Sequence, residues 1–112
     1  MSQERAEFTD SGRAPAVMER LQQARRRRSR GDHRRALVLM REACCLATND
    51  PVLWTLYGVQ CWRGNRRDEA RQALRQALWL RERMHDERRA HVLRGLLLGI
   101  ESACAQQAVR AA

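Results

Sequence analysis

Aromatic and basic side chains lie close together between residues 54 and 67, where they could stack on bases and neutralise phosphates. The segment contains Trp54, Tyr57 and Trp62, in a chain whose aromatic content is only 4%, and several arginines follow directly. Such a mixture is typical of surfaces that bind single-stranded nucleic acid. The formal net charge of +9 favours the same chemistry, because cationic side chains release counterions from a phosphate backbone.

The composition gives a second explanation for this charge. All 22 basic residues are arginine, and alanine, arginine and leucine dominate the chain. We interpret this bias as GC-rich coding, which raises the charge without selection for a polyanion. Arginine also suits solvated helix faces, where its long stem covers apolar surface. The charge therefore does not decide between a nucleic acid and another partner.

A run of four arginines at residues 25–28 has the same ambiguity. Consecutive residues of a helix differ by 100°, so the four side chains spread over about 300°. Only Arg25 and Arg28 point in one direction. Three interpretations stay open: a solvated face, a contact with acidic residues of a partner, and a contact with phosphate.

Cysteine and histidine positions do not indicate catalysis or metal binding. Cys-x-x-Cys spacing is absent, and His33, His85 and His91 are isolated. The chain also lacks a phosphate-binding loop and a serine nucleophile motif. We therefore expect a protein that is not an enzyme and has no cofactor or metal. The cysteines are expected to be small buried hydrophobic residues, namely Cys44, Cys45, Cys61 and Cys104.

Helices must position all of these side chains. From Pro15 onward, apolar residues recur at spacings of three and four, and no alternating β-branched run occurs. The sequence predicts an all-α protein with a flexible polar tail at residues 1–14 and one helical domain at residues 15–112. Breaks in the helical pattern fall at Gly31-Asp32, Asn49-Asp50-Pro51 and Gly64-Asn65.

No segment of the sequence predicts export or membrane insertion. The N-terminal residues lack the apolar core of a signal peptide, and no window approaches the roughly 18 apolar residues that span a bilayer. We expect a cytoplasmic protein without membrane contact.

A comparison of the sequence with itself gives a period of 34 residues. Residues 17–50 align with residues 51–84 without a gap. Residues 85–112 hold either one long capping helix or a third, degenerate helix pair with Gly99 near its turn. The boundary before this last segment, near Met84-His85-Asp86, is inferred from the period alone.

The second of these units resembles the tetratricopeptide repeat, whose period is also 34 residues. The residues that carry the resemblance are Trp54, Tyr57, Gly58, Ala70, Leu74 and Ala77. Gly58 and Ala70 would let two helices approach closely, with larger side chains beside the contact. Leu74, Cys61 and Glu82 stand where the repeat pattern has phenylalanine, tyrosine and proline.

The resemblance implies antiparallel helix-turn-helix pairs, stacked as a short superhelix of five to six helices. It also implies a concave surface that holds a peptide or a helix of a partner protein. The first helix of each pair would provide most of that surface.

One face of the helix that starts at Pro51 needs cover from outside its own pair. This face carries Val52, Thr55, Val59 and Trp62, at about 130° from the repeat residues. Either the C-terminal helix covers the face with Leu93, Leu96 and Leu97, or part of it stays open to a partner. The predicted groove consists of Val59, Trp62, Leu93 and Leu96, with a basic rim of Arg25, Arg28, Arg63 and Arg89. Such a groove favours an amphipathic segment with acidic flanks.

We therefore expect an adaptor, or a chaperone that shields an apolar segment of a partner protein. Short proteins with this resemblance often serve in bacterial assemblies, which supports the expectation by analogy. One alternative is a basic helical protein that binds nucleic acid and uses Trp62 as a stacking platform. Another is a self-associating subunit, because a stack of two clear units is short for closing its own core.

Overall fold

Five α-helices occupy residues 12–111, the part of the chain that the structure, a computed structural model, describes. They are α2 (Pro15–Ser29), α3 (His33–Leu46), α4 (Pro51–Arg63), α5 (Arg67–Arg83) and α6 (Glu87–Ala111). No strand occurs among these residues, so the predicted all-α class is confirmed.

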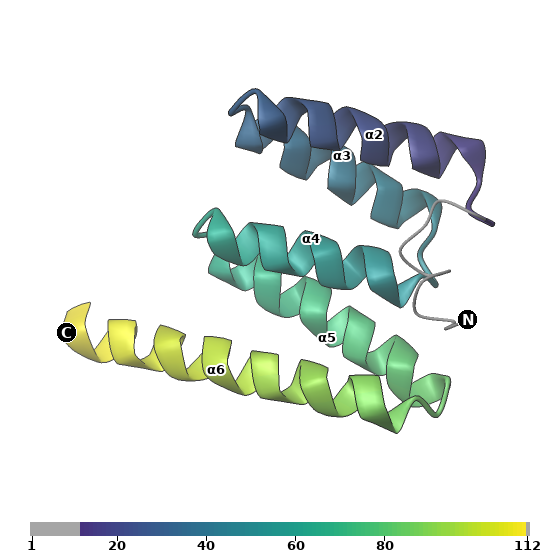
Figure 1. The fold of residues 1–112 in the computed structure, drawn as a ribbon. Helices are drawn as coiled ribbons and strands as arrows, with labels where there is room; N and C mark the ends of the chain where they lie inside the picture. Colours follow the sequence, from purple (N-terminus) through teal and green to yellow (C-terminus); the bar gives the residue numbers. More distant parts are fainter. Residues whose placement is uncertain (1–11, 112) are drawn as a thin grey trace.

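The helices stack in the order of the chain (Figure 1). α2 and α3 form one antiparallel pair, α4 and α5 form a second, and α6 lies along α5. Contacts between α3 and α4 join the two pairs. The predicted stack of antiparallel helix pairs is therefore confirmed, with five helices in this part of the chain.

Aspartate and proline residues start the helices where the sequence predicts. The carboxylate of Asp32 accepts a hydrogen bond from the first turn of α3, and that of Asp50 accepts one from the N–H of Val52 at 3.1 Å. Pro15 and Pro51 occupy the first turns of α2 and α4, where the missing N–H costs no hydrogen bond. These caps fix where α2, α3 and α4 begin.

Three of the four turns between helices have the same backbone geometry. Their central residues are left-handed, with φ of 84° at Gly31, 61° at Asn65 and 57° at His85. In each turn the following N–H donates to a carbonyl five residues earlier, which is the Schellman closure of a helix end. These bonds run from Asp32 to Arg27 (2.8 Å), from Arg66 to Cys61 (2.8 Å) and from Asp86 to Arg81 (2.9 Å).

The 34-residue period is visible in these turns and breaks at the end of α5. Gly31 and Asn65 are 34 residues apart, and so are the starts of α3 and α5. α5 then continues to Arg83, three residues beyond the equivalent of the end of α3. The turn after α5 consequently resembles the turns within the pairs rather than the turn between α3 and α4.

Residues 87–111 form one long helix, which decides between the two arrangements expected for the C-terminal segment. α6 passes through Gly99 without a turn, so this segment holds no third helix pair. The boundary expected from the period alone, near Met84-His85-Asp86, coincides with the turn before α6.

Arg13 departs from the expectation of a flexible tail over residues 1–14. Its Nε lies 3.0 Å from Oδ2 of Asp50, and both side chains are largely buried. This ion pair ties the start of α2 to the start of α4, because Asp50 also caps α4. The tail prediction is therefore wrong for Arg13, and residues 1–11 lie outside the described part.

The closest approach of α4 and α5 occurs at Gly58. A Cβ atom at this position would lie 2.8 Å from Cγ of Leu74 and 3.3 Å from the carbonyl oxygen of Ala70. Ala70 and Ala77 are completely buried along the same side of α5. Small side chains thus allow the two backbones to pack closely, as the repeat residues lead one to expect.

Polar bonds hold the two aromatic residues of α4 beside this contact. The buried Tyr57 hydroxyl donates to Oε2 of Glu69 at 3.2 Å. Nε1 of the half-buried Trp54 donates to the carbonyl oxygen of Thr48 at 2.9 Å. Each ring is therefore packed on its apolar side and satisfied at its polar atom.

Substitution of Gly58 by alanine is expected to destabilise the fold by about 1–3 kcal/mol, because overpacking against Leu74 outweighs the gain in helix propensity. Gly95→Ala is the matched control, since a Cβ at this helical position meets nothing within 4 Å. This control should gain about 0.5–1 kcal/mol. Urea denaturation measures both, and equal effects of the two substitutions would contradict the close approach.

Candidate partner-binding groove

An open apolar groove lies between α4 and α6, and residues of α5 contribute to its lining. Two adjoining hollows form it and share Leu96. The first is lined by Val52, Thr55, Leu56, Arg81, Arg89, Val92, Leu93 and Leu96. The second is lined by Val59, Trp62, Leu74, Gly95, Leu96, Gly99 and Ile100. We name the two hollows together the α4–α6 groove.

The groove follows the two helices in the same direction. Its lining advances along α4 from Val52 to Trp62 while it advances along α6 from Arg89 to Ile100. These stretches correspond to about three helical turns, or roughly 15 Å. The groove is therefore elongated, as a site for a helix or an extended segment must be.

The α6 side of the groove is partly covered and partly open. Leu93 and Leu97 are only 4% and 6% exposed, because they pack in the core cluster with α5. Val92 and Leu96, one turn apart, are 59% and 42% exposed. The C-terminal helix thus covers part of the face of α4 and leaves an apolar surface beside it, so both expected outcomes occur in part.

The structure brings the four predicted groove residues together in two sets. Val59, Trp62 and Leu96 line the second hollow, and Leu93 joins Leu96 in the first. The residues that the sequence did not single out are the glycines of α6. A side chain at Gly95 or Gly99 would meet no atom within 4 Å, so open space lies above the backbone of α6 there.

The predicted basic rim is wrong as a single feature. Arg89 lines the first hollow, whereas Arg28 and Arg63 line a different hollow between α3 and α4. Arg25 is exposed and lines none of these hollows. The reason is the direction of the helices: the last turns of α2 and α4 lie at one end of the stack, and Arg89 follows the turn at the other end (Figure 1).

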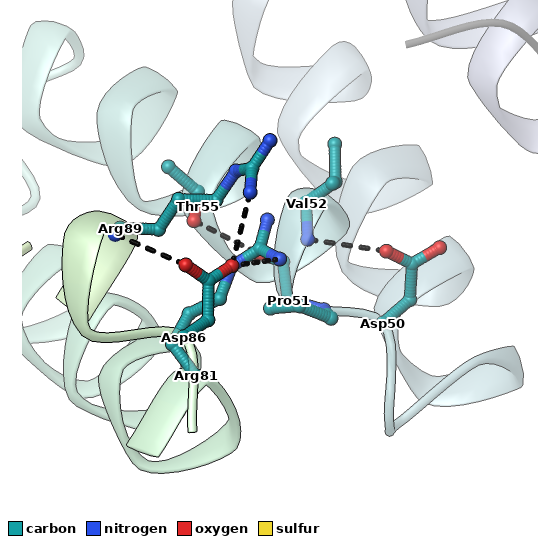
Figure 2. A network of polar contacts seen from close by, with 7 residues as sticks. All are labelled: Asp50, Pro51, Val52, Thr55, Arg81, Asp86 and Arg89. Atoms are coloured by element: carbon teal, nitrogen blue, oxygen red, sulfur yellow. Dashed lines mark hydrogen bonds and ion pairs between the residues drawn. The ribbon is translucent and has the colours of Figure 1, made fainter. Parts of the chain in front are cut away.

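A buried ion cluster closes the end of the groove near the α5–α6 turn (Figure 2). Among residues 12–111, Arg81 is the buried charged side chain, with 4% exposure. Oδ2 of Asp86 lies 3.3 Å from Nη1 of Arg81 and 3.1 Å from Nη1 of Arg89. Oδ1 of Asp86 accepts a further bond from the N–H of Arg89. One carboxylate therefore neutralises two arginines and caps α6.

A related arrangement occurs at the α2–α3 turn, on the surface. Asp32 lies 3.7 Å from Arg27 and accepts from the N–H of Arg35, with spacings identical to those around Asp86. Both partners of this ion pair are about 45% exposed. The shared pattern, Arg-x4-Asp-x2-Arg, is present in the sequence and is the signal that could have identified Arg81 and Asp86.

The charge of Asp86 is favoured by its surroundings. Burial raises the pKa of this carboxyl, but the backbone and side-chain hydrogen bonds from Arg89, with the charges of Arg89 and Arg81, lower it below its usual value overall. The carboxylate therefore stays ionised wherever the protein is folded near neutral pH.

Trp62 belongs both to the core and to the groove. The half-buried indole packs against both core clusters, and the guanidinium of Arg67 lies 5.1 Å from its ring centroid. A cation at this distance occupies a face of the ring. Trp62 thus offers an edge to the groove, and less of a free platform for stacking than the sequence suggested.

The cysteines divide into buried and accessible residues. Cys44 and Cys61 are buried, and burial raises the pKa of the Cys44 thiol to about 12, which keeps it protonated. Cys45 is exposed and Cys104 is intermediate, so the expectation of four buried cysteines is wrong for these two. Residues 12–111 contain no group of three or more potential metal ligands.

The helices between residues 12 and 111 include none long and apolar enough to cross a membrane. No protein-family model, curated protein or solved structure matches the chain. The function must therefore be argued from the geometry of the groove.

Asp86→Asn is expected to lower the free energy of unfolding by about 2 kcal/mol or more, because it leaves Arg81 buried without its countercharge. Asparagine retains the helix cap, so the loss reports on charge. Asp32→Asn, at the equivalent exposed turn, should cost less than about 1 kcal/mol. Urea denaturation at neutral pH compares the two, and equal losses would contradict a special role for the buried cluster.

The difference in stability between the wild type and Asp86→Asn is expected to depend on pH. The folded pKa of Asp86 lies below that of the unfolded chain, so its contribution is complete above about pH 4. It is lost as the pH falls through the folded value. Unfolding experiments from neutral to acid pH should show the two proteins converge, and a constant difference would contradict the assignment.

Proposed function

We propose that the protein is a non-catalytic, tetratricopeptide-like interaction module, which acts in the cytoplasm as an adaptor or a chaperone for an apolar segment of another protein. The α4–α6 groove is the observation that carries this proposal. It places exposed Val92 and Leu96 beside open backbone at Gly95 and Gly99, between two parallel helices. A continuous apolar surface of this kind is typical of a binding site.

The shape of the groove favours an amphipathic helix as the occupant. Three turns of such a helix present apolar side chains at intervals of three and four residues, which matches the length of the groove. Gly95 and Gly99 allow the backbone of the occupant to approach α6 closely. The net charge of +9 favours an occupant with acidic flanks, through faster encounter and selection against basic segments.

Self-association is a second candidate, supported by a separate observation. α6 also exposes Leu98 and Val109, by 69% and 76%, outside the lining of the groove. A second copy could cover them in a symmetric contact. Nucleic-acid binding has less support, because Arg67 already lies over the ring of Trp62.

Leu96→Glu is expected to weaken the binding of a fluorescein-labelled amphipathic peptide, about five helical turns long with glutamate flanks, by about tenfold or more. The new carboxylate lies where the two hollows meet and repels the acidic flanks of the peptide. Fluorescence polarisation at moderate salt measures the dissociation constant.

Leu98→Glu is the matched control, because it adds the same charge to the same helix outside the groove. Its affinity for the peptide should change by less than about twofold, as is usual for near-neutral surface positions. Circular dichroism should show that both variants keep their helical content. Equal weakening by the two variants, or no binding by the wild type, contradicts the proposed site.

A further inference from the structure

A third hollow lies between α3 and α4 and differs in chemistry from the α4–α6 groove. Its floor is apolar, with Ala36, Leu37, Met40 and Gly64, and its polar residues are Arg28, His33, Gln60 and Arg63. We name it the α3–α4 hollow. Its volume of about 310 Å³ is at the lower end of the range of small-molecule sites.

Regular elements, rather than long loops, position the cations of this hollow. Arg28 lies in the last turn of α2, His33 is the first residue of α3, and Arg63 is the last residue of α4. The left-handed residues Gly31 and Asn65 close the two turns concerned, which lie at the same end of the stack (Figure 1). The cations are therefore held at this end by the fold itself.

No carboxylate of residues 12–111 forms an ion pair with Arg28 or Arg63, and this is the unusual feature of the hollow. The acids of the two adjacent turns are already engaged. Asp32 pairs with Arg27, Asp68 with Arg71 and Glu69 with Arg66. Two arginines thus line one hollow without a countercharge.

The α4–α6 groove shows how the same chain neutralises such a pair. There, Arg81 and Arg89 line one hollow, and Asp86 of the adjoining turn bonds to both (Figure 2). The residue of the α4–α5 turn that is equivalent to Asp86 is Arg66, which donates the same closing backbone bond. An arginine therefore stands where the other turn supplies a carboxylate.

We propose that the α3–α4 hollow binds a compact oxyanion attached to an apolar group, such as a phosphate monoester or an aryl carboxylate. The guanidinium groups of Arg28 and Arg63 bind the anion with charge-assisted hydrogen bonds, and His33 and Gln60 supply further polar contacts. The apolar group lies on Leu37 and Met40. The anion takes the place that Asp86 fills at the other end of the stack.

This site is separate from the groove of the proposed function. The two hollows share no lining residue, and they lie against α3 and α6 respectively. Leu96→Glu should therefore leave anion binding unchanged, so each proposal can fail without the other.

Titration of the full-length protein with phenyl phosphate, benzoate and benzyl alcohol tests the proposal. Backbone amide spectra should show saturable shifts for phenyl phosphate at His33, Gly64 and their neighbours, and none for benzyl alcohol. Benzoate distinguishes the two anion sources: weaker binding than phenyl phosphate assigns the site to phosphate esters, and tighter binding assigns it to carboxylates. Absence of saturable shifts with both anions overturns the proposal.

Three charge-matched variants separate the site from the general basic surface. Arg28→Gln and Arg63→Gln should each weaken phenyl phosphate binding by about tenfold, as expected for loss of a charge-assisted hydrogen bond. Arg25→Gln removes the same charge from α2 outside the hollow and should change the affinity by less than about twofold. Equal weakening by all three variants means diffuse attraction and overturns the site, as does preferential binding of an oligonucleotide that is equally sensitive to Arg25→Gln.

Discussion

The packing of α5 against two neighbours at once is the constraint on which the rest of the structure depends. Ala70 and Ala73 of α5 belong to the core that α2, α3 and α4 share, while Leu74 and Ala77 belong to the core with α6. Alanine side chains keep α5 narrow, and the bare backbone of Gly58 accommodates Leu74. Because α4 and α6 both lie against this one helix, a groove remains between them.

The positions of the aspartates form a second level of organisation. The chain has 13 acidic and 22 basic residues, so each carboxylate must serve more than one group. Asp32, Asp50 and Asp86 each cap a helix and pair with an arginine from an earlier segment. The turn between α4 and α5 has Arg66 at the corresponding place, and the cations that lack a partner gather near this end of the stack.

Much of the fold could be predicted from the sequence, because its signals are local. Pro51, Asp50 and the spacing of apolar residues decide where helices start and which face they bury. The resemblance of one unit to a known repeat placed Gly58 and Ala70 at a helix contact before any coordinates were available. The length of α6 could not be predicted, since Gly95 and Gly99 read as breakers and no atom packs on them.

The site was less predictable than the fold, for a reason of geometry. Groove residues such as Val59 and Leu96 followed from the faces of individual helices. The grouping of Arg28 with Arg63, and of Arg89 with Arg81, depends on which ends of the helices meet in the stack. Arg81 was missed because a buried arginine cannot be recognised without the carboxylate that the turn places beside it.

The order of helix contacts has a consequence for the dynamics of the groove. Each helix makes its main contacts with its neighbours in the chain, and α6 is the last of them, supported by α5 on one side. In such a linear arrangement, stability is a sum of neighbour terms, and a terminal element can detach without the unfolding of the others. One wall of the groove is therefore also the element freest to open, so its width is set by how tightly the last helix is held.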